Sequence, residues 1–323
     1  MTDTTTTERP GVIDARPVRH PGRWVALAVI AVLVAMMISS VVTNKAWDWP
    51  FVLKVMNYSP VLDGLLKGTI IVTIVSMILG VVLGVILAIM RLSDNPVLRG
   101  VAFVYIWFFR AVPRYVLMTI LGLGVLTLYP TLDLGVPFGK DLGLTFYTLD
   151  VKTISSGITV GIIGLGLSEA AYMAEIARAG ILSVDNGQRE AAQALGMSNG
   201  KAMRRIILPQ AMRVIVPPTG NEAISMVKDT SLLTAVPVTA ELFNQAQNVA
   251  NNTYKVMPSY VGALMWYLIL CTLLMLLQSW LERRFARGFG ADFRLRIGER
   301  EDQRIGRHQR QPFGLQHARR GQP

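Results

Sequence analysis

Long apolar runs separated by shorter polar segments dominate the chain. Each of five runs has about the 20 residues that an α-helix needs to cross the hydrocarbon core of a bilayer. They cover residues 24–42, 68–90, 101–128, 156–176 and 260–280. The pattern therefore predicts an all-α, polytopic membrane protein.

Basic residues in the polar segments predict a sixth span that hydropathy alone does not show. They gather before the first run, at 91–100, at 189–205 and in the tail at 283–323, which holds eleven arginines. Such residues favour the cytoplasmic side of a membrane. All four segments can lie there only if one more span follows the 189–205 segment. We expect this span at 214–242, with both termini in the cytoplasm.

The expected extra span contains three charged residues, Glu222, Lys228 and Asp229. A charge at mid-membrane costs about 2.5–3.5 kcal/mol on insertion scales, so such groups face partners or a water-filled path. Glu222 and Asp229 are seven residues apart and share one helix face. These three residues are therefore candidate functional groups: the lysine suits an anionic partner and the two acids suit a cationic one. The alternative is a structural ion cluster that includes Arg110.

Composition excludes several other classes of protein. Of 323 residues, 52% are hydrophobic, which is typical of a polytopic membrane protein. The net charge of +11 gathers in the tails and between the runs, so it indicates membrane orientation and not nucleic-acid binding. Cys271 is the only cysteine, which excludes an internal disulfide. The sequence predicts no catalytic residues, metal site or cofactor.

Smaller patterns concern contacts within and between helices. Closely spaced glycines in two of the spans predict tight helix packing. They stand at positions 80, 84, 161, 164 and 166. Glu175 and Arg178 are three residues apart, so we expect them to form a local ion pair.

The polar segment after the fourth run has the most specific pattern. It reads Glu190-Ala191-Ala192, three residues, Gly196, nine residues, Ile206, one residue, and then Leu208-Pro209. Its charges keep it out of the hydrocarbon. Gly196 suits a left-handed helix end, and we expect Ser198 to cap a second, amphipathic helix that stops at Pro209. A helix-turn-helix of this kind suits docking into a groove of another protein.

This spacing resembles the cytoplasmic EAA loop of ABC importer permeases, and further motifs resemble the polar amino acid branch of that family (the histidine, glutamine and arginine type). These motifs are Tyr105–Pro113, Ala171-Tyr172, Ala174-Glu175, Arg178–Ile181, Gly187-Gln188 and Lys228-Asp229-Thr230-Ser231-Leu232. The resemblance covers roughly residues 64–285. The chain departs from the branch at Ala111, Val112, Arg114 and Leu117, which puts its specificity in question.

The resemblance implies the permease subunit of an ATP-driven importer of polar, and possibly basic, amino acids in the bacterial cytoplasmic membrane. It implies a dimer of ATP-binding cassette ATPase subunits, a second identical or homologous permease chain, an extracytoplasmic solute-binding protein and membrane lipid as partners. ATP hydrolysis then belongs to the ATPase, so the chain itself is not an enzyme. The implied coupling residues are Glu190, Ala191, Ala192, Gly196, Ile206, Leu208 and Pro209, and the implied substrate-binding residues are Glu222, Lys228 and Asp229.

The expected organisation has four parts. A disordered cytoplasmic tail (1–23) precedes an extra helix and an external loop (24–63), the permease domain (64–285, with its EAA loop at about 186–212) and a basic, disordered cytoplasmic tail (286–323). Three alternatives stay open. They are a permease of the same superfamily for an opine or osmolyte, a secondary transporter driven by an ion gradient, and a membrane-anchored scaffold.

Overall fold

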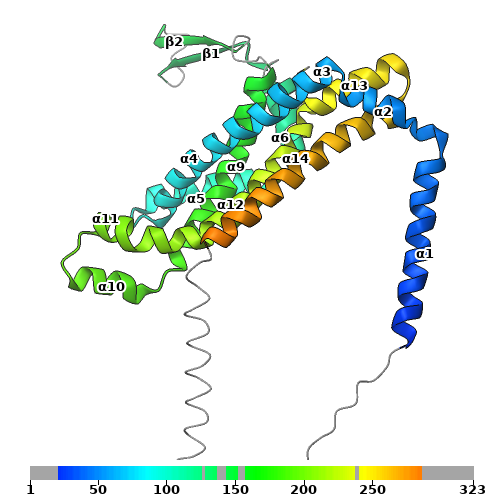
Figure 1. The fold of residues 1–323 in the computed structure, drawn as a ribbon. Helices are drawn as coiled ribbons and strands as arrows, with labels where there is room; N and C mark the ends of the chain where they lie inside the picture. The colour runs from blue at the N-terminus through cyan, green and yellow to red at the C-terminus, as the bar shows by residue number, and fades with distance from the viewer. Residues whose placement is uncertain (1–20, 126–127, 137–142, 152–156, 237–239, 286–323) are drawn as a thin grey trace, which may run out of the picture. The chain divides into compact units, whose positions relative to one another are not determined.

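The computed structural model describes residues 21–125, 128–136, 143–151, 157–236 and 240–285 (Figure 1). The chain divides into two compact units, Met1–Trp49 and Pro50–Pro323. The tails predicted to be disordered lie outside the described residues, except that the first helix already begins at Pro21.

The first unit contains one long apolar helix, α1 (Pro21–Thr43), followed by the short helix η1 (Lys45–Trp47). None of the side chains of α1 is buried. Its 23 residues rise about 34 Å, enough to cross a bilayer. The helix therefore matches the first predicted span and presents an apolar surface on all sides.

Most of the second unit is helical. Its first part contains α2 (Trp49–Met56), α3 (Ser59–Asp63), the π-helical η2 (Gly64–Ile71), α4 (Val72–Leu92), α5 (Pro96–Ala111), α6 (Arg114–Thr119) and η3 (Ile120–Val125). Its second part contains α9 (Gly157–Leu182), α10 (Asn186–Ala194), α11 (Asn199–Ala202), η5 (Met203–Ile207), α12 (Leu208–Asp229), η6 (Thr230–Ala235), α13 (Leu242–Thr253) and α14 (Val256–Phe285). The predicted boundary at residue 64 stays a prediction, but α2 and α3 already pack with α13 and α14 in one apolar cluster.

Four described helices are long and apolar enough to cross a membrane, and a bent pair makes a fifth candidate. The four are Pro21–Thr43, Ser59–Leu92, Gly157–Leu182 and Val256–Arg284. The expected extra span corresponds to α12, which is too polar to pass the same test. Its crossing of the membrane stays a prediction.

The bent pair corrects the prediction of one straight span over 101–128. The helix α5 ends at Ala111, α6 begins at Arg114, and the chain turns by 99° between them. Pro113 lacks a backbone N–H and disfavours helical geometry at the residue before it, and Val112 is accordingly extended, with ψ at 127°. The apolar run is therefore continuous in sequence but broken in space.

A small β-hairpin lies between η3 and α9 and was not anticipated from the sequence. The strands β1 (Thr131–Gly135) and β2 (Thr145–Asp150) pair antiparallel, with Leu132 opposite Leu149 and Leu134 opposite Tyr147. In Figure 1 the hairpin projects from the end of the bundle opposite to α10 and α11. It leaves the all-α membrane bundle unchanged.

Glycines bring α4 against α9, as the small-residue spacing predicts. A Cβ atom at Gly80 would lie 2.7 Å from Cγ of Glu169, and one at Gly84 would collide with Cβ of Met173. Because both sequence numbers increase together, the two helices run parallel. The glycines of α9 are equally close to neighbours, since a Cβ at Gly166 would lie 2.6 Å from a methyl group of Leu79.

Two predictions for the EAA segment have different outcomes. Gly196 ends α10 in the left-handed conformation, with φ at 71°. The N–H of Met197 donates to the carbonyl of Ala192, and that of Gly196 to Gln193, which is the Schellman arrangement. The prediction that the second helix stops at Pro209 is wrong. Pro209 stands in the first turn of α12, directly after the π-helical η5, where a missing N–H is tolerated. Ser198 precedes α11 in an extended conformation but makes no side-chain cap.

A buried carboxylate fixes the opposite end of the bundle. Glu241 is fully buried and caps α13 by accepting from the backbone N–H groups of Phe243 (2.8 Å) and Asn244 (3.0 Å). Its other oxygen accepts from the hydroxyl of Tyr267 (2.5 Å) on α14 and from that of Thr69 (3.3 Å) on η2. One side chain thus connects three helical segments.

We predict that Gly84→Ala destabilises the bundle, because its Cβ meets Cβ of Met173 and two backbone atoms of α9. Overpacking of this kind costs about 1–3 kcal/mol. Thermal unfolding of the purified protein in detergent measures the effect. Gly100→Ala is the matched control, since it adds the same methyl group to a helix with nothing within 4 Å. Equal unfolding temperatures for the two variants would contradict the packing.

Candidate functional site

The guanidinium group of Arg114 is the centre of an ionic cluster within the bundle. Arg114 is the first residue of α6, so the break at Pro113 sets its position. Its Nη2 lies 2.9 Å from Oε2 of Glu169 on α9 and 3.9 Å from Oε2 of Glu222 on α12. Its Nη1 donates to Oδ2 of Asp229, also on α12. Three helices therefore converge on one cation.

The cluster is strongly shielded and has an excess of negative charge. The side chain of Glu169 is 0% exposed, that of Arg114 14%, and those of Glu222 and Asp229 25% and 27%. Glu169 stands in the middle of α9, about 18 Å along the helix from its first residue. Three carboxylates and one guanidinium carry a formal charge of −2. Since desolvated charges require compensation, the site is suited to accept a further cation.

One oxygen of Glu169 has no partner within the described part of the chain. Oε1 is buried and makes no hydrogen bond there, while Oε2 accepts from Arg114. The guanidinium carbon of Arg114 lies 4.7 Å from the ring centre of Tyr172. The arrangement therefore offers free acceptor capacity beside a resident guanidinium group, with an aromatic wall.

The structure places the three predicted substrate residues in two groups. Glu222 and Asp229 lie together against Arg114, as their spacing of seven predicts. Lys228 is exposed and, among the described residues, makes no ion pair with them. The arginine of the cluster is Arg114 and not Arg110, which lies over the Tyr172 ring at 5.7 Å.

Sequence reasoning missed Glu169 and the role of Arg114. A glutamate in the middle of an apolar run is itself a signal, because ionisable groups within spans are costly and face the protein interior. Arg114 was noted as a departure from the family pattern that puts specificity in question, but its position after the break at Pro113 and its contacts with the acids were not predicted. The predicted local pair of Glu175 and Arg178 is confirmed, with Nη2 at 2.8 Å from Oε2.

The EAA segment forms an exposed projection at one end of the bundle (Figure 1). Glu190, Ala191 and Gly196 are exposed, while Ala192 is buried. Farther along, Leu208 and Pro209 are exposed and Ile206 is half-buried. Leu195 was not predicted as a contact, yet its side chain is 81% exposed at the end of α10. Leu195 thus places an apolar group on the surface of an otherwise polar projection.

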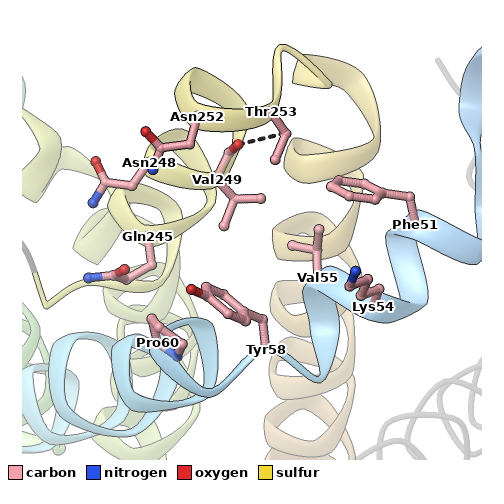
Figure 2. Close-up of a pocket in the computed structure, with 10 residues that line it drawn as sticks. All are labelled: Phe51, Lys54, Val55, Tyr58, Pro60, Gln245, Asn248, Val249, Asn252 and Thr253. Atoms are coloured by element: carbon pink, nitrogen blue, oxygen red, sulfur yellow. Dashed lines mark hydrogen bonds between the residues drawn. The ribbon is translucent and has the colours of Figure 1, made fainter.

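A separate pocket of about 320 Å³ lies between α2, the start of α3 and α13 (Figure 2). Its lining combines the aromatic rings of Phe51 and Tyr58 with the side-chain amides of Gln245, Asn248 and Asn252. It includes none of the residues that the sequence singled out.

A helical bundle with candidate spans, a broken helix, a shielded ionic cluster and an exposed docking projection is typical of a membrane transporter. Residues 80–287 match the family described as the inner membrane component of binding-protein-dependent transport systems. The chain is similar to an arginine transport system permease protein of Corynebacterium glutamicum, with 45% identity over 283 residues. The aligned region covers 87% of this chain and 86% of that protein. The chain is 34% identical over 242 residues to a probable amino-acid permease protein of Bacillus subtilis, which covers 75% of this chain and 97% of that protein.

A solved structure gives the same picture. The chain superposes on one chain of an amino acid ABC transporter crystallised with histidines, with a TM-score of 0.57 and 30% identity over 70% of this chain and 94% of that one. The chain belongs to the family of inner membrane components of binding-protein-dependent transport systems. It is the non-catalytic, multi-pass permease subunit of an ABC importer for amino acids in the bacterial inner membrane, and such a system includes an ATPase and a binding protein. This membership decides against an ion-driven transporter and a scaffold.

We predict that Arg114→Leu strongly destabilises the protein, because it leaves the buried carboxylate of Glu169 without its cation. Breaking a buried pair costs about 3–5 kcal/mol. Adding Glu169→Gln should restore part of the loss, and thermal unfolding of the purified complex measures both.

Arg178→Leu provides the comparison, since it breaks a pair whose side chains are 34% and 25% exposed. Such a pair contributes about 0–1 kcal/mol. If the Arg114 and Arg178 variants lost equal stability, the ionic cluster would not be the buried pair described above.

Proposed function

We propose that the chain carries arginine or a similar basic amino acid, and that the cluster around Arg114 is the intramembrane binding site. The observation that supports this proposal is the excess of two negative charges among Glu169, Glu222, Asp229 and Arg114. A guanidinium group is planar and pairs with carboxylates in a forked geometry. Arg114 contacts each of the three carboxylates through one oxygen only, and Oε1 of Glu169 makes no hydrogen bond within the described chain, so acceptor capacity is left for an incoming guanidinium group. The name of the Corynebacterium relative supports the same substrate.

In this proposal the residues have distinct tasks. Glu222 and Asp229 are partly exposed and receive the substrate cation, while the buried Glu169 holds Arg114 in place. Lys228 receives the α-carboxylate, which its exposed position and lack of an ion pair within the described chain support. Tyr172 supplies a cation–π face on the inner side of the cluster.

We propose further that the EAA segment transmits ATP-driven motion from a dimer of ATPase subunits. The proposed coupling residues are Glu190, Ala191, Ala192, Gly196, Ile206, Leu208 and Pro209, together with Leu195. The buried Ala192 supports α10 from within and does not contact the ATPase directly. The Schellman end of α10 turns the chain sharply, which supports a compact knob that fits a cleft. A second permease chain, identical or homologous, completes the membrane part, and the binding protein delivers the amino acid from outside.

The proposed topology places both termini in the cytoplasm and counts α12 as a sixth crossing. The segment 64–285 is then the permease domain, with α1 as an addition to it. The basic loop at 91–100 and the EAA segment share one side in this arrangement, as the positive-inside rule requires.

Substitution of either exposed acid should weaken arginine binding. We expect Glu222→Gln and Asp229→Asn each to lower the affinity of the purified complex for radiolabelled arginine by about tenfold, since charge-assisted hydrogen bonds contribute about 1.5–3 kcal/mol. Asp63→Asn is the control, because it neutralises an exposed carboxylate that pairs only with Lys67 at 3.2 Å. Unchanged affinity and uptake in both acid variants would exclude the proposed site.

Lys228 has its own test. Lys228→Gln should weaken the binding of arginine but leave that of agmatine, its analogue without a carboxylate, unchanged. Equilibrium binding to the same complex provides the comparison. An equal effect on the two ligands, or none on either, would assign Lys228 another role.

Leu195→Asp should reduce co-purification of the ATPase subunits, because it places a charge on the exposed apolar tip of α10. We expect a loss of at least tenfold, since burying an unpaired charge in an interface costs several kcal/mol. Val97→Asp is the control, as Val97 is 68% exposed but lies outside the EAA segment. Normal ATPase recovery with Leu195→Asp would remove Leu195 from the interface.

A further inference from the structure

A second ionic site, of opposite charge, lies next to Tyr172. A cavity of about 450 Å³ opens between α4, α5 and α9. Its lining residues are Arg91, Phe103, Ile106, Trp107, Arg110, Ala111, Tyr172 and Glu175. None of the four charged residues of the substrate cluster is among them. The guanidinium carbons of Arg114 and Arg110 lie 4.7 and 5.7 Å from the ring centre of Tyr172, so this residue borders both sites.

The cations of this cavity have aromatic neighbours but form no ion pair with a carboxylate among the described residues. The guanidinium carbon of Arg91 lies 4.9 Å from the ring centre of Phe103, and that of Arg110 lies 5.7 Å from that of Tyr172. The Nε atom of Arg91 is buried and has no hydrogen-bond partner within the described chain. A buried donor without a partner costs about 1–3 kcal/mol. The cavity therefore contains a donor that a bound anion would satisfy.

The single acid of the lining does not neutralise these arginines. Oε2 of Glu175 accepts from both Nε (3.0 Å) and Nη2 (2.8 Å) of Arg178, so its charge is already balanced by a local partner. Arg91 and Arg110 then leave a net charge of +2 in the cavity. This is the reverse of the substrate cluster, and a basic amino acid would be repelled from it.

The position of the cavity indicates where its ligand comes from. Arg91 belongs to the last turn of α4, and α4 runs parallel to α9, which leads into the EAA segment. Phe103 and Trp107 on its rim are 51% and 61% exposed, so the cavity opens sideways through aromatic residues of the kind found at membrane interfaces. Basic pockets between helices at the cytoplasmic side bind the head groups of anionic lipids.

We propose that this cavity binds a phosphate group, that of an anionic phospholipid of the cytoplasmic leaflet. Arg91 and Arg110 donate to the phosphate oxygens, as arginines do in forked contacts, and Phe103 and Trp107 contact the adjoining glycerol and acyl region. The side of the membrane rests on the topology of the proposed function. The lipid then connects α4, α5 and α9 next to the break that positions Arg114.

Titration of the assembled, delipidated complex with phosphatidylglycerol, followed by native mass spectrometry, tests the proposal. We expect Arg91→Gln and Arg110→Gln each to weaken phosphatidylglycerol binding roughly fivefold, since each basic side chain contributes about 1 kcal/mol to the attraction of anionic lipid. Binding of the neutral phosphatidylcholine should not change. Arg99→Gln is the matched control, an exposed arginine of α5 that does not line the cavity.

Further arms identify the source of the phosphate and protect against misfolding. The double variant Arg91→Lys, Arg110→Lys retains the charge and should retain most of the lipid affinity. If millimolar inorganic phosphate displaces phosphatidylglycerol, the site binds the free anion. If phosphatidylglycerol stays bound, the site binds lipid. Equal phosphatidylglycerol affinity in wild type and both glutamine variants would overturn the proposal. Arginine binding through Glu222 and Asp229 is measured separately, so failure of either site is distinguishable.

Discussion

The imbalance between one guanidinium group and three carboxylates is the constraint on which the rest of the bundle depends. Glu169 is fully buried in the middle of α9, where a carboxylate without a cation would be prohibitively costly. The break at Pro113 brings Arg114 to it, and the glycines of α4 allow that helix to approach α9 at the same level. Helix α12 adds two further acids from the opposite direction. The buried carboxylate, the helix break and the close helix packing therefore depend on one another.

Helix α9 contributes residues to both ionic sites. Glu169, Tyr172 and Glu175 follow one another at intervals of three residues, so each lies beside the next on the helix surface. Glu169 belongs to the ionic cluster, Tyr172 lies near both Arg114 and Arg110, and Glu175 lines the Arg91–Arg110 cavity. Substrate binding and lipid binding, as proposed, thus depend on neighbouring residues of one helix.

The helical architecture could largely be predicted from the sequence, because long apolar runs have few other solutions in a membrane. The span that the charge count placed at 214–242 overlaps α12 (Leu208–Asp229), whose crossing stays a prediction, and Gly196 adopts the left-handed conformation predicted for it. What failed had a common cause. Hydropathy averages over a window, so it concealed the break at Pro113, the single charge of Glu169 and the hairpin between two spans. The prediction for Pro209 failed for a different reason. A proline is tolerated in the first turn of a helix, so it can mark the beginning of one helix as well as the end of another.

The ionic cluster around Arg114 could be predicted only in part. Spacing along one helix brought Glu222 and Asp229 together, because that relation is local. Their meeting with Arg114 and Glu169 depends on residues 53 to 115 positions away in sequence, and no single-helix pattern contains such information. Lys228 shows a second limit, since it is adjacent to Asp229 in sequence but makes no ion pair with the acids among the described residues.

The continuity of α11, η5 and α12 has a mechanical consequence. From Asn199 to Asp229 the helical segments α11, η5 and α12 follow one another directly, with Pro217 and Pro218 inside α12. One end of this stretch belongs to the EAA segment and the other bears Glu222 and Asp229. If the EAA segment moves with the ATPase, as proposed, the movement reaches the two acids along one helical path. The π-helical turn at Met203–Ile207 lies directly before α12. A shift of this turn by one residue would rotate α12 about its axis.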